Sequence, residues 1–174
     1  MSLTETVRVG PHAGALDWLA GHGVEYELRE HPVTITARET ARVEGIDPRR
    51  FAKTLGVRVE DERTALVVVD AADRLDLARA REVLGGGPVR LLDEDELAAL
   101  APDCEVGTLP PIGELFGVRV YADNAIRDDP EITFHAGSHA FTLTVDRAAW
   151  ERAVGVAYGN LALDVDERPA WASS

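Results

Sequence analysis

The 18 basic side chains of this sequence are 17 arginines and a single lysine, Lys53. An ammonium is a compact point charge with three rotatable donors, whereas a guanidinium is a rigid planar fork, so the two are not interchangeable in a tight site. One lysine amid so many arginines indicates a position where a guanidinium would not serve. The segment after Lys53 is apolar and strand-like, and a strand end can present a charge to a cleft. The alternative is a solvated surface lysine.

A loop with two glycines and two consecutive prolines, at residues 104–113, could supply backbone groups to a site. Glycine allows a ligand to approach the backbone closely, and proline restricts the path of the chain. Gly107 and Pro110 therefore lie in a segment that could hold preorganised N–H groups against a carbonyl or an oxyanion. The alternative is an ordinary rigid connection between two elements.

A second glycine-containing loop, at residues 136–139, lies between two predicted strands. Gly137 and Ser138 could surround an anion there, and His139 could act as a general base. The alternative is a hairpin turn whose glycine has a positive φ. His31, which precedes a proline, could face a pocket or could hydrogen-bond its own loop.

The positions of the cysteine and the histidines in the sequence give little support for metal or cysteine chemistry. Cys104 is the only cysteine, which excludes an internal disulfide and any multi-cysteine metal site, and no base is indicated beside it. None of the five histidines has a metal-ligand spacing to another histidine or to the cysteine. We therefore expect no metal and no other cofactor, and we expect Cys104 to be a buried or inert thiol.

Length and composition are those of an ordinary globular protein. The 174 residues, 45% hydrophobic and 28% charged, predict one domain spanning residues 1–174. No apolar run is long enough to cross a bilayer, and residues 1–10 lack the features of a secretory signal, so we expect a cytoplasmic protein without a membrane partner. The net charge of −13 argues against extensive binding of duplex nucleic acid. Local groups could still hold one charged end of a nucleic acid.

Periodicity and capping signals predict alternating short helices and strands. Helices are expected near residues 11–22, 36–44, 75–84, 93–100 and 146–154, with a further short helix that begins at Asp47-Pro48 and leads directly to Lys53. Strands are expected near residues 24–28, 54–60, 64–70, 89–92, 118–122, 131–135 and 139–145. The first strand alternates apolar and charged residues and should be half-buried, and the next two should form a hairpin. Hairpins mixed with helical connections predict an α+β fold with a mixed sheet, followed by a tail after Gly155 without a clear prediction.

Several segments, in their order and spacing, resemble the YbaK/prolyl-tRNA-synthetase-associated domain family, which comprises free-standing and appended editing domains that hydrolyse mischarged aminoacyl-tRNA. The similarity runs from about Tyr26 to about Val154. The segments that carry it are His31-Pro32, residues 36–41, 52–55, 65–69 and 74–77, the Gly107-to-Pro111 loop, which is similar to the family's G-x-x-x-P motif, and residues 120–123 and 136–139. The resemblance implies an α+β domain with a mixed, curved sheet flanked by short helices.

The resemblance also implies which residues act. Lys53 matches the family's functional lysine, which helps to hold the charged 3′ end or the aminoacyl group. Gly107 and Pro110 match the G-x-x-x-P loop, whose backbone contacts the aminoacyl carbonyl and amino group. Gly137 matches the glycine of a third pocket loop. Lys53, Gly107 and Gly137 are thus the implied catalytic residues.

Two positions depart from the patterns of known members. Thr142 falls where some cysteine-specific members carry an aspartate, and Thr54 differs from the asparagine associated with alanine-specific members. The residues expected to bind substrate are Thr54, Pro110, Ser138, His139, Thr142 and His31. The sequence does not indicate which amino acid or which tRNA is edited.

The implied function is that of a trans-acting aminoacyl-tRNA deacylase, with the acceptor end of an aminoacyl-tRNA as partner and a synthetase as a further candidate partner. An aminoacyl ester is already activated, so a catalyst mainly has to orient it and to stabilise the developing oxyanion. Water or the terminal ribose hydroxyl would be the nucleophile. The alternative is a non-catalytic module of the same fold that binds aminoacylated ends or a synthetase; a metal hydrolase lacks ligands in the sequence.

Overall fold

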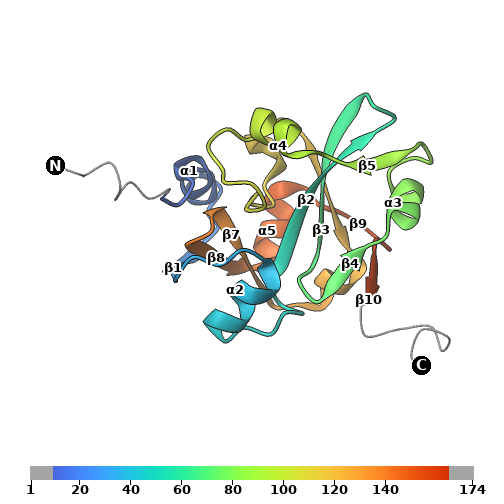
Figure 1. Ribbon diagram of the computed structural model, residues 1–174. Coiled ribbons are helices and arrows are strands. Elements are labelled where there is room, and N and C mark those ends of the chain that lie inside the picture. Colours follow the sequence, from blue (N-terminus) through green and yellow to red (C-terminus); the bar gives the residue numbers. More distant parts are fainter. Residues whose placement is uncertain (1–9, 165–174) are drawn as a thin grey trace.

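The structure, a computed structural model, describes residues 10–164 (Figure 1). Its helices are α1 (Ala13–Gly21), α2 (Ala37–Glu44), α3 (Leu77–Val83), α4 (Glu94–Leu100), α5 (Arg147–Val154) and the 3-10 helices η2 (Gly113–Leu115) and η3 (Asn124–Asp128). Its strands are β1 (Tyr26–Glu30), β2 (Ala52–Val59), β3 (Arg63–Asp70), β4 (Asp73–Leu75), β5 (Val89–Leu91), β6 (Arg119–Asp123), β7 (Glu131–Ser138), β8 (Phe141–Asp146), β9 (Ala157–Gly159) and β10 (Ala162–Asp164). The α+β class is confirmed.

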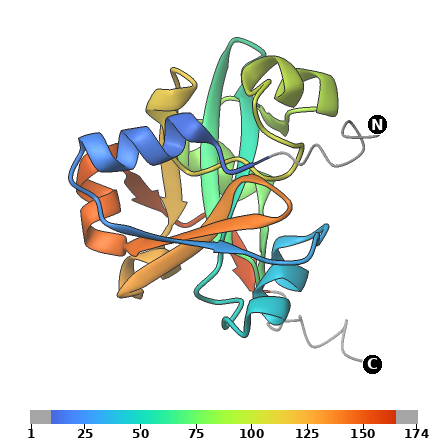
Figure 2. The same cartoon turned by 90° about the vertical axis from the view of Figure 1, so that its left-hand side faces the viewer.

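The strands form three sheets. The five-stranded sheet has the order β5-β2-β3-β6-β9, with β2 antiparallel to both of its neighbours and β6 parallel to both of its own. This is the predicted mixed sheet. A second, antiparallel sheet has the order β1-β8-β7, and β10 pairs with β4. In Figure 2 the β1-β8-β7 sheet crosses in front of β2 and β3.

The two faces of the five-stranded sheet pack against different cores. Ala52 and Val68 belong to a cluster that also contains Leu109, Ala136 and Trp150, which come from the segments between α4 and α5 and from α5 itself. On the other face a second cluster joins the alternate residues of β2 and β3, such as Val57 and Val69, to α3. The first core therefore extends to the loop after α4 and to β7.

Strand alternation places Lys53 and Thr54 on opposite faces, because successive side chains of a strand point in opposite directions. Thr54 pairs with Val68, which belongs to the first core, whereas Lys53 pairs with Val69, which belongs to the second. Sheet geometry thus assigns these two neighbouring residues to different surroundings.

Capping predictions hold at several helix ends. Thr36 accepts a hydrogen bond from the Glu39 N–H at the start of α2, and Asp93 forms a capping box at the start of α4. Gly45 and Gly155 end α2 and α5 in the left-handed conformation, which glycine adopts without steric cost. The β2–β3 hairpin is also confirmed.

Other local predictions are wrong. The short helix before Lys53 is absent: the Asp47 carboxylate accepts from the Arg49 N–H (3.0 Å) and closes a turn at residues 48–50, after which β2 begins at Ala52. The first strand is more exposed than predicted: β1 lies at an edge, pairs only with β8, and exposes even its apolar residues Tyr26 and Leu28 by 39%. The predicted helix at 75–84 begins at Leu77, because residues 73–75 form β4.

Part of the tail is ordered into strands. β9 adds to the edge of the five-stranded sheet beside β6, and β10 pairs with β4. Residues 165–174 lie outside the described part of the chain. Within residues 10–164, every helix is too short to span a bilayer, the longest having nine residues.

Candidate functional site

The two glycine-containing loops that the sequence indicated lie against each other. The Glu105 N–H donates to the Gly137 carbonyl (3.0 Å), and the Gly137 N–H donates to the Thr108 carbonyl (3.0 Å). The His139 N–H donates to Oε1 of Glu105 (3.1 Å), and its ring Nε2 lies 3.0 Å from the Val106 carbonyl oxygen. We call residues 105–108 and 137–139 the loop pair.

The two ring nitrogens of His139 differ in their hydrogen bonding. A carbonyl oxygen only accepts, so Nε2 carries the hydrogen in the neutral ring and Nδ1 carries the lone pair. Nδ1 is buried and has no hydrogen-bond partner among the described residues. A general base needs such a lone pair within reach of water. Because Nδ1 is buried, general-base action by His139 stays a prediction.

Gly107 and Gly137 differ in the space around their α-carbons. Both have positive φ, +86° and +81°. A Cβ at Gly137 would lie 2.9 Å from Cβ of His12 and 3.3 Å from Sγ of Cys104, whereas at Gly107 the nearest atom, Cε1 of His139, is 3.9 Å away. Gly137 is confined and both of its backbone groups bond the opposite loop, so it holds the loop pair together; Gly107 is open on its α-carbon side.

The proline part of the motif is anchored to the core. Counting from Gly107, the last place of a G-x-x-x-P motif falls on Pro111 rather than on Pro110. Both prolines are buried, and the Pro111 carbonyl accepts from Nε1 of Trp150 on α5 (2.8 Å). The loop therefore enters the site from a fixed point, with Pro110 beside that anchor.

Ser138 and Cys104 are enclosed by the loop pair. The Ser138 hydroxyl oxygen accepts from the Ala140 N–H (3.1 Å) at the β7–β8 turn, and the residue is buried. Burial raises the pKa of the Cys104 thiol to about 12, with a smaller contribution from Asp103. The thiol is thus protonated at neutral pH, as expected for an inert cysteine.

Lys53 hydrogen-bonds to the β3–β4 turn rather than to the loop pair. It is the second residue of β2, and its Nζ donates to the backbone carbonyl of Asp73 at the start of β4 (3.1 Å). Burial lowers the pKa of the ammonium; the charge of Asp73 opposes this shift, and the charges of Arg38 and Arg74 add to it. That Lys53 shares a cleft with the loop pair stays a prediction. Thr54, on the opposite face of β2, is buried, and its hydroxyl has no hydrogen-bond partner among the described residues.

Thr142 and His31 meet at a buried carboxylate that the sequence did not reveal. The Thr142 hydroxyl donates to Oε1 of Glu44 (2.9 Å), and Nε2 of His31 lies 3.6 Å from Oε2 of the same residue. The side chains of His31 and Glu44 are only 3% and 5% exposed. His31 Nδ1 lies 2.7 Å from the Pro32 carbonyl and so donates to it, in agreement with the loop-bonding alternative. No local signal marks Glu44, because it reads as the last turn of a surface helix.

A neutral histidine continues this polar layer between α2 and β7. Burial lowers the pKa of His135 to about 3, and the charges of His139 and His31 act in the same direction. Its Nε2 lies 3.0 Å from the Thr40 hydroxyl, which donates to the Thr36 carbonyl and therefore accepts from His135. His31 Nε2 and Glu44 Oε2 have no hydrogen-bond partner among the described residues, but the other contacts of this buried layer join α2 to the β7–β8 hairpin.

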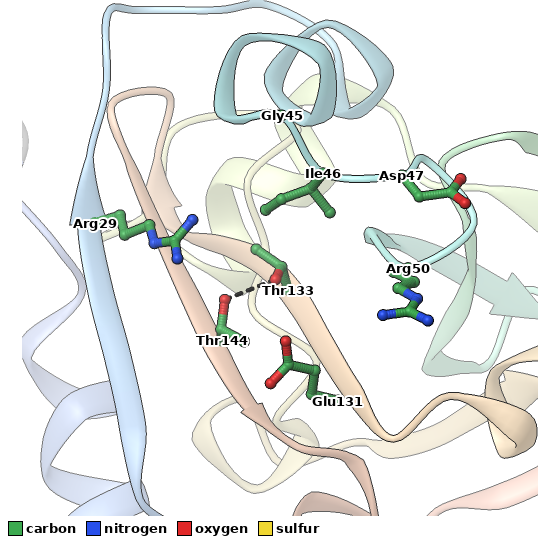
Figure 3. Close-up of a pocket in the computed structure, with 8 residues that line it drawn as sticks. All are labelled: Arg29, Gly45, Ile46, Asp47, Arg50, Glu131, Thr133 and Thr144. Carbon is green, nitrogen blue, oxygen red and sulfur yellow. Dashed lines mark hydrogen bonds between the residues drawn. The ribbon is translucent and has the colours of Figure 1, made fainter.

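A pocket of about 290 Å³ lies beside this layer (Figure 3). Arg29 and Arg50 lie on opposite sides of it, Glu131 lies between them, and the hydroxyls of Thr133 and Thr144 bond each other (2.6 Å). None of the residues that we predicted to act lines this pocket. Within residues 10–164, no group of three or more His, Cys, Asp or Glu side chains is arranged to hold a metal ion.

The predicted residues thus fall into separate groups. The structure brings Gly107, Gly137, Ser138 and His139 together in the loop pair, with Pro110 behind it. Thr142 and His31 meet at Glu44, and Lys53 lies with Asp73. Sequence reasoning did not single out Glu105, Glu44, Arg38 or Arg74.

Comparison with known proteins identifies the class to which this fold and this loop pair belong. The model of the aminoacyl-tRNA editing domain family matches residues 31–153, and the chain is therefore a member of that family. The resemblance drawn from the sequence is confirmed.

Individual relatives agree with this assignment. The proline–tRNA ligase of Bacillus cytotoxicus is 35% identical over 81 residues, which are 47% of this chain and 14% of the ligase. A hypothetical protein of known crystal structure aligns with a TM-score of 0.78 at 23% identity, over 86% of this chain and 99% of its own. A protein proposed to be a trans-editing enzyme for prolyl-tRNA synthetase aligns with a TM-score of 0.75 at 24% identity, over 86% of this chain and 94% of its own. At these identities the two structures show the fold.

Proposed function

We propose that this protein is a trans-acting aminoacyl-tRNA deacylase. The observation that carries the proposal is the loop pair: in a member of the editing-domain family, the G-x-x-x-P loop and the glycine of β7 are hydrogen-bonded into one unit beside His139. The substrate is the ester that joins a mischarged amino acid to the terminal ribose of a tRNA. The products are the free amino acid and the deacylated tRNA.

The reaction needs orientation more than a strong nucleophile, since an aminoacyl ester is already activated. The oxygen of a water molecule bonds to the carbonyl carbon, the bond from that carbon to the ribose oxygen breaks, and the ribose oxygen takes the proton. Backbone groups of the open Gly107 side would stabilise the oxyanion, and His139 Nδ1 would receive the water's proton. Lys53 would hold the charged 3′ end.

A panel of mischarged tRNAs tests the proposal. Single-turnover release of labelled amino acid should exceed the spontaneous rate for at least one ester, and His139→Ala should lower that release because Nδ1 is lost. The matched control is His22→Ala, at the C-terminal end of α1, whose ring bonds the Trp18 carbonyl, stacks on the Trp18 ring and lies 3.9 Å from Glu114. Binding of acylated tRNA without release from any member of the panel would favour the non-catalytic module.

A further inference from the structure

We propose that Arg38, Arg74 and Lys53 together form a phosphate site. This site binds the last phosphodiester of an RNA 3′ end. We call these three residues the cation group. The inference rests on the proposed function for the identity of the RNA, but its geometry is independent of the loop pair.

The cation group converges on one short turn. Lys53 Nζ donates to the Asp73 carbonyl (3.1 Å), and Nη2 of Arg38, from α2, lies 3.4 Å from the carbonyl oxygen of the preceding residue, Ala72. Two cationic groups from different elements therefore contact successive carbonyl oxygens of the β3–β4 turn. Arg74 follows Asp73 in the chain, so its backbone belongs to the same turn, and its charge acts on Lys53.

The charges of Arg38 and Arg74 disfavour the ammonium form of Lys53, and the Asp73 carboxylate opposes them. The hydrogen bonds that Lys53 and Arg38 donate here both go to backbone carbonyls, and like charges close together repel each other. The Asp73 charge offsets the repulsion in part, and the effect of the two arginines on Lys53 shows that they lie within electrostatic range of it. The chain has 31 acidic and only 18 basic residues, so three clustered cations stand out from the composition.

The arrangement suits a phosphodiester that arrives from solvent. Arg38 and Arg74 are exposed, whereas Lys53 is half-buried behind them. Guanidinium groups bind phosphate oxygens in pairs, and an ammonium contributes a point charge from beneath. A single phosphate could therefore contact the arginines at the surface and Lys53 at the base. A long duplex is not needed, which agrees with the acidic surface elsewhere.

The first experiment measures binding of a short, unacylated RNA with the tRNA 3′ terminal sequence by fluorescence anisotropy over a range of salt concentrations. Arg38→Ala and Arg74→Ala should each weaken binding roughly tenfold at low salt. Each should also reduce the slope of log K against log salt by about 0.7, the value for one lost contact to single-stranded nucleic acid. Arg152→Ala, an equal change of charge at an exposed position on α5, should change neither quantity.

A second experiment tests which phosphate of the RNA the cation group binds. Replacing the last phosphodiester by a neutral methylphosphonate should weaken binding to the wild-type protein about as much as Arg38→Ala does, and the two changes together should be no worse than either alone. A methylphosphonate at the 5′ end of the same RNA should have no such coupling. Additive effects, or arginine variants that match Arg152→Ala, would overturn the proposal, as would failure of the wild-type protein to bind the RNA.

The outcomes separate this inference from the proposed function. Deacylation by the wild-type protein with unaffected arginine variants would refute the cation group and leave the deacylase standing. Coupled binding without hydrolysis of any ester would refute the deacylase and leave the phosphate site standing. Arg38→Lys and Arg74→Lys, which keep the charge, together with thermal melting of every variant, distinguish lost contacts from lost folding.

Discussion

The loop pair and the cation group are held together by different kinds of interaction. In the loop pair, backbone groups bond each other at 3.0 Å, and the glycine at the centre has no room for a side chain. In the cation group, long charged side chains from β2, α2 and β4 reach one turn, and their heads lie at or near the surface. The first region is held together mainly by backbone hydrogen bonds, with the Glu105 carboxylate accepting from the His139 N–H, whereas the second is built from charged side chains. Changes in the first should therefore affect stability and rate, and changes in the second should affect binding with little loss of fold.

The largest effect should follow from removing the Lys53 ammonium. Lys53→Ala should reduce single-turnover deacylation about 100-fold, since losing the charge that holds the 3′ end would misplace the ester, and a small misplacement can cost that much. Unfolding free energy should fall by only about 1 kcal/mol, the value of the one hydrogen bond to Asp73. Lys53→Arg should also be impaired, because a planar fork cannot replace a compact ammonium. Full activity of Lys53→Ala, measured with melting run in parallel, would remove Lys53 from the site.

Substitution of the two glycines of the loop pair should affect stability and deacylation rate to different extents. Gly137→Ala should destabilise the fold by about 3 kcal/mol, because it adds a strained positive φ to a contact of 2.9 Å with Cβ of His12. Gly107→Ala should cost only about 1 kcal/mol, since its surroundings are open, but it should slow deacylation. Denaturant melts and single-turnover rates on the same two variants check this. Equal stability losses would show that the space around the two glycines does not matter.

A smaller, pH-dependent effect belongs to the carboxyl group of Asp70, at the end of β3 near the cation group. Burial raises the pKa of Asp70 to about 8, and the charges of Asp129, Asp73 and Asp123 act in the same direction. The folded state therefore holds a proton that the unfolded chain releases near pH 3.9. This contribution to stability is complete below about pH 4 and is lost as the pH rises through 8.

Asp70→Asn should therefore flatten the decline of stability between pH 4 and pH 8. The variant keeps the shape of the side chain without its charge, and it should gain on the order of 2 kcal/mol over the wild-type protein at pH 8. Melting temperature as a function of pH is the measurement, and Asp17→Asn, an exposed aspartate of α1, is the control. A wild-type profile parallel to that of Asp70→Asn would show that Asp70 is ionised in the folded protein.

The smallest effect is expected at Cys104. Since burial raises the pKa of the thiol to about 12, it carries no thiolate near neutral pH, and Cys104→Ser should deacylate at the wild-type rate. A chelator should likewise leave the rate unchanged. Stability of the serine variant should decrease slightly, because a hydroxyl replaces a thiol beside Gly137. Loss of activity in either experiment would place catalysis on a thiol or a metal rather than on the loop pair.

Several parts of the fold could be predicted because their signals are local. Thr36, Asp93 and Asp146 cap helices by bonding N–H groups two or three residues away, and Gly45 and Gly155 end helices through their own φ. The Asp47-Pro48 signal failed for a related reason: the same carboxylate bond closes a turn equally well, and pairing of the following residues into β2 prevented a helix. A cap indicates where the chain turns, and the next tertiary contact decides whether a helix or a strand comes after the turn.

By itself, the sequence determined five of the six predicted helices, the β2–β3 hairpin, the family and the glycine-containing segments that form the loop pair, because short-range bonds and residue order encode them. Only the tertiary structure decided that Lys53 and Thr54 face different cores, that Glu44 meets Thr142, and that Arg38 and Arg74 gather around Lys53. These contacts join residues distant in the chain, and a one-residue change of register would reverse every face of β2. The sequence gives the chemistry of each side chain, but the packing of sheets and helices decides which side chains act together.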